Sequence, residues 1–424
     1  MAGARSTTAQ KRSQRSVAAA VNADDVGIAS LLASKEMIIV CGSGGVGKTT
    51  TAAALAAQAV VNIGGRVLVL TVDPAKRLAN ALGLQAFGNT ETRVPHSAFT
   101  DAGVTPRGEL WAAMLDTKAG WDELIRRHAP DATLRDTVLA NPLYQNITGR
   151  FVQSHDYIAM ERLHELHASG RYDLVIIDTP PSRNALDILD APSRMMEFFG
   201  SRLLRWLTVP YRSRIFTLAS KPFYQVADRI LGSRFLQDIA EFFVLFQTME
   251  KGFVQRAREV ERLLADPRTS FLIVSTLEAA PAHEAGFLAA ALAERNLPLG
   301  GIVLNRAMPT VLREPSVAKA ASRLRDVAAS TELPADLIAA LAKPASKADA
   351  VSPDVVRGIL GEIADRFHDI AMVATREAER RAELQRLAPF TSTAPALDHD
   401  IHNLASLLEL GNHLWREPDE PDSV

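Results

Sequence analysis

The sequence predicts an α/β protein with a doubly wound, mostly parallel sheet and a helical subdomain inserted into it. Five short apolar runs support this prediction, because they are rich in β-branched residues and do not alternate with polar residues, as expected of strands buried on both faces. Long stretches with a helical pattern separate the runs, and such strand–helix–strand alternation is typical of a parallel sheet covered by helices. The predicted strands lie at residues 37–40, 67–72, 174–177, 271–274 and 301–304.

Length and composition suit one large α/β domain with insertions. The chain has 424 residues, of which 47% are hydrophobic and 23% are charged, so it can bury a large core without disulfide bonds. Two stretches, at about 84–171 and 191–269, are too long for simple crossovers, and their patterns predict helical insertions. We expect a flexible tail over residues 1–34, one domain over 35–412 and a disordered acidic tail over 413–424.

Three further helices are expected outside the insertions. An Ala-rich helix over about 49–62 follows the first strand, and Gly64-Gly65 is a plausible C-terminal stop. A region over about 354–387 carries Arg and Glu on its polar face. A segment rich in Pro, Thr and Ser, at 389–395, separates it from a short last helix over about 399–410.

Charge and cysteine content exclude several classes of protein. Lys and Arg number 47 and Asp and Glu number 49, and this net charge of −2 argues against a nucleic-acid-binding protein. The single cysteine excludes a disulfide framework, a zinc site of several thiolates and an iron–sulfur cluster held by this chain alone. The sequence contains no run of about 18 apolar residues, so it predicts no membrane-spanning helix. The N-terminus lacks the apolar core of a secretory signal. We therefore expect a cytoplasmic location.

The strongest motif is a glycine-rich loop that follows the first predicted strand. It matches the pattern G-x-x-x-x-G-K-[ST] throughout, and an Ala-rich helix follows it, which predicts a P-loop NTPase; a glycine-rich turn that binds nothing fits this context poorly. Glycines let successive backbone N–H groups curl around phosphate oxygens at a helix N-terminus. Lys48 would neutralise the β- and γ-phosphates of ATP, Thr49 would bind Mg²⁺ through its hydroxyl, and Thr50 would reach the α-phosphate. The other loop residues expected to contact nucleotide are Gly42, Gly44, Gly45, Val46 and Gly47.

Two aspartates follow predicted strands and are candidates for chemistry at this loop. Asp73 follows the second strand, from which it would orient or deprotonate a water that attacks the γ-phosphate, although Asp-Pro is also a common way to open a turn. Asp178 ends the third strand, the position from which an acidic residue reaches Mg²⁺ in P-loop proteins; the alternative is a helix N-cap. The loop after it, Thr179–Asn184, would lie near the γ-phosphate and change shape on hydrolysis.

Three segments together resemble the ArsA-type ATPases, a family with a deviant P-loop that includes the arsenite-pump ATPase and the targeting factor for tail-anchored membrane proteins. They are Gly42–Thr50, Asp73-Pro74-Ala75 and Asp178-Thr179-Pro180-Pro181. The resemblance implies that Asp73 and Lys48 act in ATP hydrolysis, with Asp73 as the base for water. It also implies that Asn305 hydrogen-bonds adenine, with a strand-end turn residue as the alternative. A looser match around Pro395 resembles the loop that covers the base.

One departure from the family bears on the quaternary structure. The family normally has a lysine after the first loop glycine, which reaches the partner's nucleotide across a dimer interface, and here that residue is Ser43. A trans-acting cation of this kind is worth about 10³–10⁵ in rate. We therefore expect a heterodimer with a paralogue that carries the lysine. A slowly turning homodimer, a nucleotide-binding structural subunit and a small-molecule phosphotransferase or ligase remain alternatives.

The family's cysteine sites are absent from this sequence. Arsenite binding in the pump needs cysteine thiolates and the targeting factor uses a Cys-x-x-Cys zinc clamp, whereas this chain has only Cys41. We expect no arsenite site through cysteines, and we expect Cys41 to be a small buried hydrophobic residue rather than a reactive thiol.

The second insertion has an unusual composition, with nine of the 16 phenylalanines lying between Phe198 and Phe253. An adaptable Met/Phe surface suits a groove for an apolar helix, such as that of a membrane-protein client. Apolar helical faces are more often packed core or dimer interface, and we favour that structural role.

Overall fold

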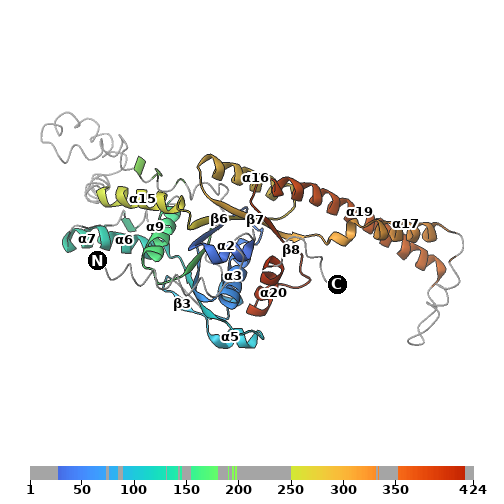
Figure 1. The fold of residues 1–424 in the computed structure, drawn as a ribbon, viewed down its shortest axis with the longest axis horizontal. Coiled ribbons are helices and arrows are strands. Elements are labelled where there is room, and N and C mark those ends of the chain that lie inside the picture. Colours follow the sequence, from blue (N-terminus) through green and yellow to red (C-terminus); the bar gives the residue numbers. More distant parts are fainter. Residues whose placement is uncertain are drawn as a thin grey trace, which may run out of the picture.

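Within the described residues, eight strands form one sheet in the order β3-β4-β2-β5-β1-β6-β7-β8 (Figure 1). The computed structural model describes residues 27–72, 76–84, 89–129, 131–141, 144–145, 154–179, 190, 193–194, 196–197, 250–330, 333 and 352–415. All neighbouring strands are parallel except the pair β3–β4. The strands are β1 Met37–Cys41, β2 Gly65–Thr71, β3 Thr92–Arg93, β4 Gly108–Met114, β5 Leu174–Asp178, β6 Thr269–Ser275, β7 Leu299–Ala307 and β8 Thr391–Pro395. The predicted fold class is confirmed, and each of the five predicted runs is a strand of this sheet.

Helices cover both faces of the sheet, which explains why its strands are apolar throughout. Along β1, Ile38 and Val40 pack into the core shared with α3, whereas Met37 and Ile39 pack into the core shared with α9, α15 and α16. A sheet buried on both faces needs apolar residues at every strand position, and all five residues of β1 are buried. The first face carries α2 Ile28–Ser34, α3 Lys48–Gln58 and α20 Leu404–Trp415; the second carries α9 Ser154–Ala168, α15 Glu250–Leu264 and α16 Ala279–Glu294.

The helix after the glycine-rich loop runs along the sheet and ends where predicted. α3 continues into a π-helical turn, η1 Ala59–Ile63, and the chain stops at Gly64, whose φ of 91° is in the left-handed region that glycine adopts without strain. Alanine dominates α3 because the helix lies close against the sheet: every residue from Thr51 to Gln58 is buried.

The first insertion is not wholly helical, which corrects the prediction for residues 84–171. It contains β3 and β4, and β4 pairs with β2 in parallel over its whole length. Gly108–Met114 contains Trp and Ala and no β-branched residue, so its composition does not favour a strand, yet pairing with β2 satisfies its backbone groups. The helices around these strands are α4 Lys76–Ala81, α5 His96–Asp101, α6 Thr117–His128 and α7 Ala132–Ala140.

Parts of both predicted tails are helical. Residues 28–34 form α2 rather than a flexible tail, because Ile28, Leu31 and Leu32 lie on one helical face and are buried against the core. The last helix begins later than predicted and extends to Trp415, past the predicted boundary at 412, with Leu414 buried. Residues 1–26 and 416–424 lie outside the described residues.

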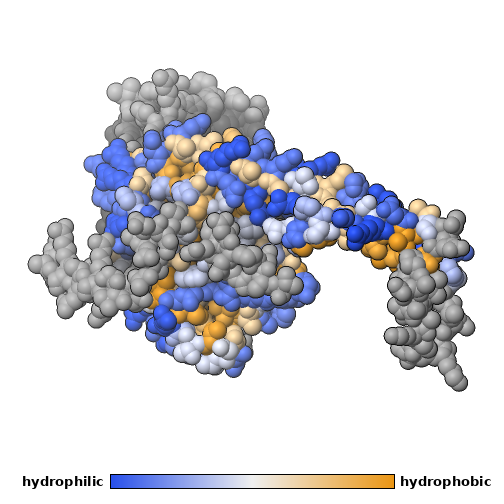
Figure 2. All heavy atoms as spheres, turned by 45° about the vertical axis from the view of Figure 1, so that its right-hand side comes forward, coloured by the Kyte–Doolittle hydropathy of each residue, from blue (hydrophilic) through white to orange (hydrophobic). Residues whose placement is uncertain are grey.

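A two-helix arm projects from the body of the molecule (Figures 1 and 2). It leaves β7 through the short 3-10 helix η2 Thr310–Arg313, continues as α17 Pro315–Ala329 and returns as α19 Pro353–Gln385, which leads to β8. Each helix has proline at its start, where the missing N–H is not needed, and Ser352 caps α19 by accepting a hydrogen bond from the N–H of Val355. The predicted helix over 354–387 is confirmed as α19, whereas its partner α17 was not predicted.

In the part of the chain that the structure describes, no helix combines the length and the apolar character needed to cross a bilayer. Of the Phe/Met-rich stretch, most lies outside the described residues; Phe253, on α15, is buried beside Trp121 of α6.

Candidate nucleotide site

The glycine-rich loop connects β1 to α3 at the carboxyl edge of the sheet. Gly42, Gly45 and Gly47 have φ values of 147°, 81° and 95°, a backbone region that other residues adopt only with strain. A Cβ at Gly42 would overlap the carbonyl oxygen of Val274 on the neighbouring β6. The loop therefore has this shape because glycines allow both the left-handed turns and the close approach to β6.

Lys48, the first residue of α3, turns back over the loop. Its side chain is buried, with 6% of the residue exposed, and Nζ donates a hydrogen bond to the carbonyl oxygen of Ser43 at 2.8 Å. The ammonium group is thus held inside the curl of backbone, where the N–H groups and the start of α3 favour an anion.

Thr49 and Asp178 meet at the bottom of the loop. The Thr49 hydroxyl donates a 2.5 Å hydrogen bond to Oδ2 of Asp178, and the Thr71 hydroxyl donates to the same oxygen at 2.9 Å. Asp178 is fully buried at the end of β5, next to β1 in the sheet. The sheet register explains the contact, because Val40, two residues before the loop, lies directly beside Asp178.

This pair of oxygens fits a small hard cation. Mg²⁺ prefers oxygen ligands, and in phosphate sites it keeps several waters and uses few protein groups. One hydroxyl and one carboxylate, 2.5 Å apart beside the glycine-rich loop, match that donor set. Among the described residues no group of three or more His, Cys, Asp or Glu side chains is arranged to hold a metal, so the structure offers no competing all-protein metal site there.

A cleft of about 1030 Å³ opens over the loop. Its walls come from the loop and α3, from the ends of β7 and β8, from α4 and from the segment that leads into α20. Of the predicted nucleotide contacts it brings together Gly45, Gly47, Lys48, Thr49, Thr50, Asn305 and Pro395. Gly42, Gly44 and Val46 belong to the same loop and are not among the residues that line the cleft.

Asn305, the predicted adenine contact, also holds the loop in place. Its Nδ2 donates to the carbonyl oxygen of Val46 at 2.8 Å, and its Oδ1 accepts from the N–H of Arg306 at 3.0 Å. An amide nitrogen has two protons, so the bond to Val46 leaves one for another acceptor. A Cβ on Gly47 would overlap Nδ2, which makes Gly47 and Asn305 a closely fitted pair.

Several residues of the cleft were not identified from the sequence. Arg306 has a φ of 56°, unusual for a residue other than glycine, and follows Asn305 at the rim of the cleft. His399, in the segment between β8 and α20, also lines the cleft, and hydrogen bonding to Asp398 and the charge of Glu409 raise the pKa of its imidazole. Only the strained backbone distinguishes Arg306, and no sequence pattern marks His399, because the tertiary fold brings this segment to the loop.

Asp73, the predicted catalytic base, and the loop from Pro180 onwards lie outside the described residues. Thr179 is described, and its buried hydroxyl donates to the carbonyl oxygen of Val40 at 2.9 Å, beside the end of β1. Thr179, directly after β5, therefore lines the cleft over the glycine-rich loop.

Cys41 is the small buried residue that the sequence predicted. It is 5% exposed, its thiol lies 3.7 Å from the carbonyl oxygen of Leu272, and burial raises the pKa of the thiol to about 12. Burial and the raised pKa both lower the fraction of thiolate, the reactive form, as expected of a buried structural cysteine.

Comparison with known proteins agrees with this geometry. Residues 35–326 match the family model of the anion-transporting ATPases. The chain is 30% identical to an ATPase GET3 of Malassezia globosa over 38% of its own length and 43% of that protein. It is 26% identical to an ATPase GET3 of Komagataella phaffii, over 64% of this chain and 73% of the relative, and 28% identical to an uncharacterized protein of Streptomyces coelicolor, over 64% and 62%. The matches thus span from under half to about three quarters of these relatives. Because the family model covers more than half of the chain and includes the loop, β5 and β7, this protein belongs to the anion-transporting ATPase family, the ArsA type.

Proposed function

We propose that this protein is an ATPase that binds MgATP in the cleft over the glycine-rich loop and hydrolyses it as one half of a dimer. The observation that carries the proposal is the contact between Thr49 and Asp178, which places a hydroxyl and a carboxylate beside the loop lysine. Mg²⁺, when bound there, would neutralise charge on the β- and γ-phosphate oxygens.

In this proposal, different residues of the site bind the phosphates, the adenine and the attacking water. The loop N–H groups and the start of α3 hold the phosphates, and Lys48 exchanges its bond to Ser43 for a phosphate oxygen. Asn305 and Pro395 flank the space for the adenine. Asp73 acts as the general base that accepts a proton from the attacking water. In this proposal, loss of the γ-phosphate changes the shape of the loop after Thr179 and so opens the dimer.

The proposed partner is a paralogous chain that carries a lysine where this chain has Ser43. The side chain of Ser43 carries no charge, and its hydroxyl oxygen has no hydrogen-bond partner among the described residues. A homodimer of this chain thus has no cation at that position to add to its partner's nucleotide. A heterodimer supplies the cation to this chain's nucleotide and explains how slow hydrolysis is raised to a useful rate.

Replacing Ser43 with lysine tests both parts of this proposal. We expect the wild-type chain alone to release phosphate slowly and Ser43→Lys to release it at least tenfold faster, because each chain then supplies a cation to its partner. Ser43→Gln, which adds length without charge, is the matched control, and Lys48→Ala should abolish the activity of both. A rate for Ser43→Lys no higher than that of Ser43→Gln would contradict the role of a trans-acting cation.

The client and the location are further parts of the proposal. The family match and the relatives named ATPase GET3 support an ATPase. The further proposals of a cytoplasmic location, a dimer and a membrane-protein or apolar-helix client follow from the sequence resemblance to the ArsA-type ATPases. A structural subunit that binds nucleotide without turnover is the second candidate, and the absent charge at Ser43 favours it. Unchanged activity of the heterodimer after Lys48→Ala in this chain would select that second candidate.

A further inference from the structure

The arm carries an exposed apolar stripe along its longer helix. Its members are aliphatic side chains between 41% and 52% exposed, a value far above that of the core. Aliphatic side chains scattered singly on a surface need no explanation, whereas several that share one side of a helix mark a contact surface. Here they form two groups, at 355–363 and 370–373, with the exposed Arg366 between them. The members of this stripe, here called the α19 stripe, are Val355, Ile359, Ile363, Ile370 and Val373.

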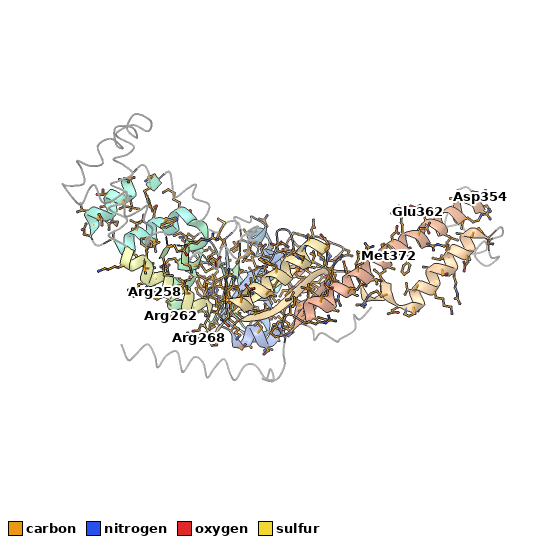
Figure 3. The ribbon with its side chains drawn as sticks, turned by 90° about the horizontal axis from the view of Figure 1, so that it is seen from above. Arg258, Arg262, Arg268, Asp354, Glu362 and Met372 are labelled. Atoms are coloured by element: carbon orange, nitrogen blue, oxygen red, sulfur yellow. The ribbon has the colours of Figure 1, made fainter. Side chains whose placement is uncertain are left out.

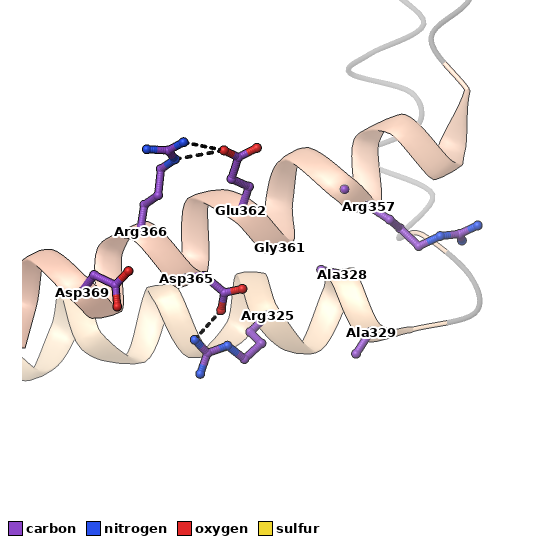
Figure 4. Close-up of a pocket in the computed structure, with 10 residues that line it drawn as sticks. Arg325, Ala328, Ala329, Arg357, Gly361, Glu362, Asp365, Arg366 and Asp369 are labelled. Atoms are coloured by element: carbon purple, nitrogen blue, oxygen red, sulfur yellow. Dashed lines mark hydrogen bonds and ion pairs between the residues drawn. The ribbon is translucent and has the colours of Figure 1, made fainter.

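The α19 stripe faces away from α17. Gly361 faces Ala328, since a Cβ on Gly361 would lie 3.6 Å from that side chain, and Asp365 pairs with Arg325 of α17 at 2.7 Å. Figure 4 shows Asp365 directed toward α17 and Glu362 and Arg366 directed outward. With 3.6 residues per turn, Ile359 and Ile363 share that outward side, so α19 has one face packed on α17 and a second apolar face open to solvent.

The residues of the α19 stripe are spaced almost symmetrically on either side of the middle of the stripe. Reading from a point near Ala364, Ile359 lies about as far toward one end as Ile370 lies toward the other, and Val355 is matched by Val373. In a two-fold symmetric contact, residue i meets residue j of the partner and j meets i. An antiparallel copy of α19 therefore places Ile359 against Ile370 of the second copy, along about 27 Å of helix at 1.5 Å per residue.

The charges beside the stripe have the same symmetry. Glu362 and Arg366 lie two residues on either side of Ala364, are 64% and 74% exposed, and pair with each other at 2.7 Å within the helix. In the antiparallel arrangement, Glu362 of one copy lies opposite Arg366 of the other, at both sides of the two-fold axis. Opposite charges face each other twice, which favours this orientation over a parallel one.

The arm is held firmly at its root. Glu377 of α19 accepts a hydrogen bond from the N–H of Met308 at 2.9 Å, and Arg380 donates to the carbonyl oxygen of Leu277 at 2.8 Å. Both α17 and α19 are formed before any contact is made, so pairing does not have to order a helix, which lowers its entropic cost.

From these observations we propose that the α19 stripe binds the same stripe of a second copy of this chain, antiparallel about a two-fold axis near Ala364. The two arms together form a four-helix arrangement. The contact is separate from the nucleotide cleft and does not depend on the proposed ATPase activity. Its area is that of a few helical turns, so we expect a weak, concentration-dependent association of the kind found for interfaces under about 1,200 Å².

Sedimentation velocity of the full chain in nucleotide-free buffer tests the contact. We expect the weight-average mass to rise with concentration, and Ile359→Glu to weaken the association at least tenfold, because each dimer contains the substitution twice. Met372→Glu is the matched control: Met372, labelled on α19 in Figure 3, is 44% exposed and, one residue before Val373, lies about 100° away from it around the helix axis. A wild-type mass that stays monomeric up to several hundred micromolar would overturn the proposal, as would equal effects of the two substitutions.

Charge exchange tests the antiparallel orientation. Glu362→Arg and Arg366→Glu each place like charges across the axis, so each variant alone should associate more weakly than the wild type. An equimolar mixture should recover association, because Arg at 362 of one chain then faces Glu at 366 of the other. Repulsion within each helix is the same in the mixture as in the separate variants, so recovery reports a contact between chains. Absence of recovery would overturn the two-fold arrangement.

Discussion

Gly47 combines two constraints at a single residue of the nucleotide loop. Its φ is 95°, and a Cβ there would overlap Nδ2 of Asn305. We expect Gly47→Ala to reduce the free energy of unfolding by more than the roughly 1–2 kcal/mol typical of a left-handed residue that is not glycine. Gly45→Ala is the matched control, since Gly45 has a φ of 81° and nothing lies within 4 Å of its Cβ position.

Chemical denaturation of the two glycine variants measures this difference. Adding Asn305→Ala to Gly47→Ala should recover part of the loss, because it removes the side chain that a Cβ at residue 47 overlaps. Equal losses for the two glycine variants, with no recovery, would show that Asn305 moves aside without cost.

Asp178 joins the loop helix to the sheet through Thr49 and Thr71. Asp178→Asn keeps the shape of the side chain and removes its charge, so it should weaken Mg²⁺-dependent ATP binding at least tenfold while leaving magnesium-free binding nearly unchanged. Titrating ATP with and without magnesium checks this. Thr71→Val removes a bond to the same oxygen without removing the charge, and it should leave the magnesium dependence intact.

The loop was predictable at this scale because its geometry is local. The loop pattern, which includes Gly42, Gly47, Lys48 and Thr49, is compatible with only a few backbone conformations. Asp178 was recognisable as the end of an apolar strand. Arg306 was not predictable as a residue of the cleft, because its place there depends on how β7 lies beside the rest of the sheet.

Among the elements, α6, α9 and α15 meet around a buried carboxylate. Glu161 of α9 is 5% exposed and pairs with Arg256 of α15 at 3.0 Å and with Arg127 of α6 at 3.8 Å. Burial, aided by the nearby charges of Glu165 and Glu259, raises the pKa of Glu161 to about 7, and the two arginines only partly offset this. The direction follows from the cost of removing a carboxylate from water.

This raised pKa predicts a pH dependence of stability. The folded protein binds the Glu161 proton more tightly than the unfolded chain, so the contribution is fully present below the ordinary carboxyl pKa and is lost as pH rises from about 4.5 through about 7. We expect thermal unfolding to show a loss of roughly 1–3 kcal/mol over this range that is absent in Glu161→Gln. An unchanged slope in the variant would show that the two arginines keep the carboxylate ionised.

The elements were predicted well where burial alone decides them. Five strands were recognised as apolar runs because both of their faces are covered. β4 was missed because its Trp and Ala residues do not form such a run, and α17 was missed because its small residues Ala321 and Ala328 give a weak apolar pattern. The arm itself forms because α17 and α19 pack together, and no local sequence pattern predicts that contact.

At the scale of the whole molecule, the C-terminal segment completes the nucleotide cleft. Gln58 near the end of α3 donates to the carbonyl oxygen of Leu408 at 2.9 Å and to Asn412 at 2.7 Å, so α20 is fixed to the helix that begins at the loop. The segment from Pro395 to His402 then forms one wall of the cleft. We expect MgATP to slow hydrogen exchange of this wall in the wild type and to leave it unchanged in Lys48→Ala; slowing in both would show an effect that does not come from the loop.

The claim on which the account depends is that the loop at Gly42–Thr50 binds the triphosphate of ATP, and isothermal titration calorimetry of MgATP measures it most directly. The account predicts saturable binding with one site per chain, a loss of at least tenfold in affinity for Lys48→Ala, and a dependence on magnesium that Asp178→Asn removes. A flat titration of the wild type at millimolar MgATP, or equal binding by Lys48→Ala, would contradict it.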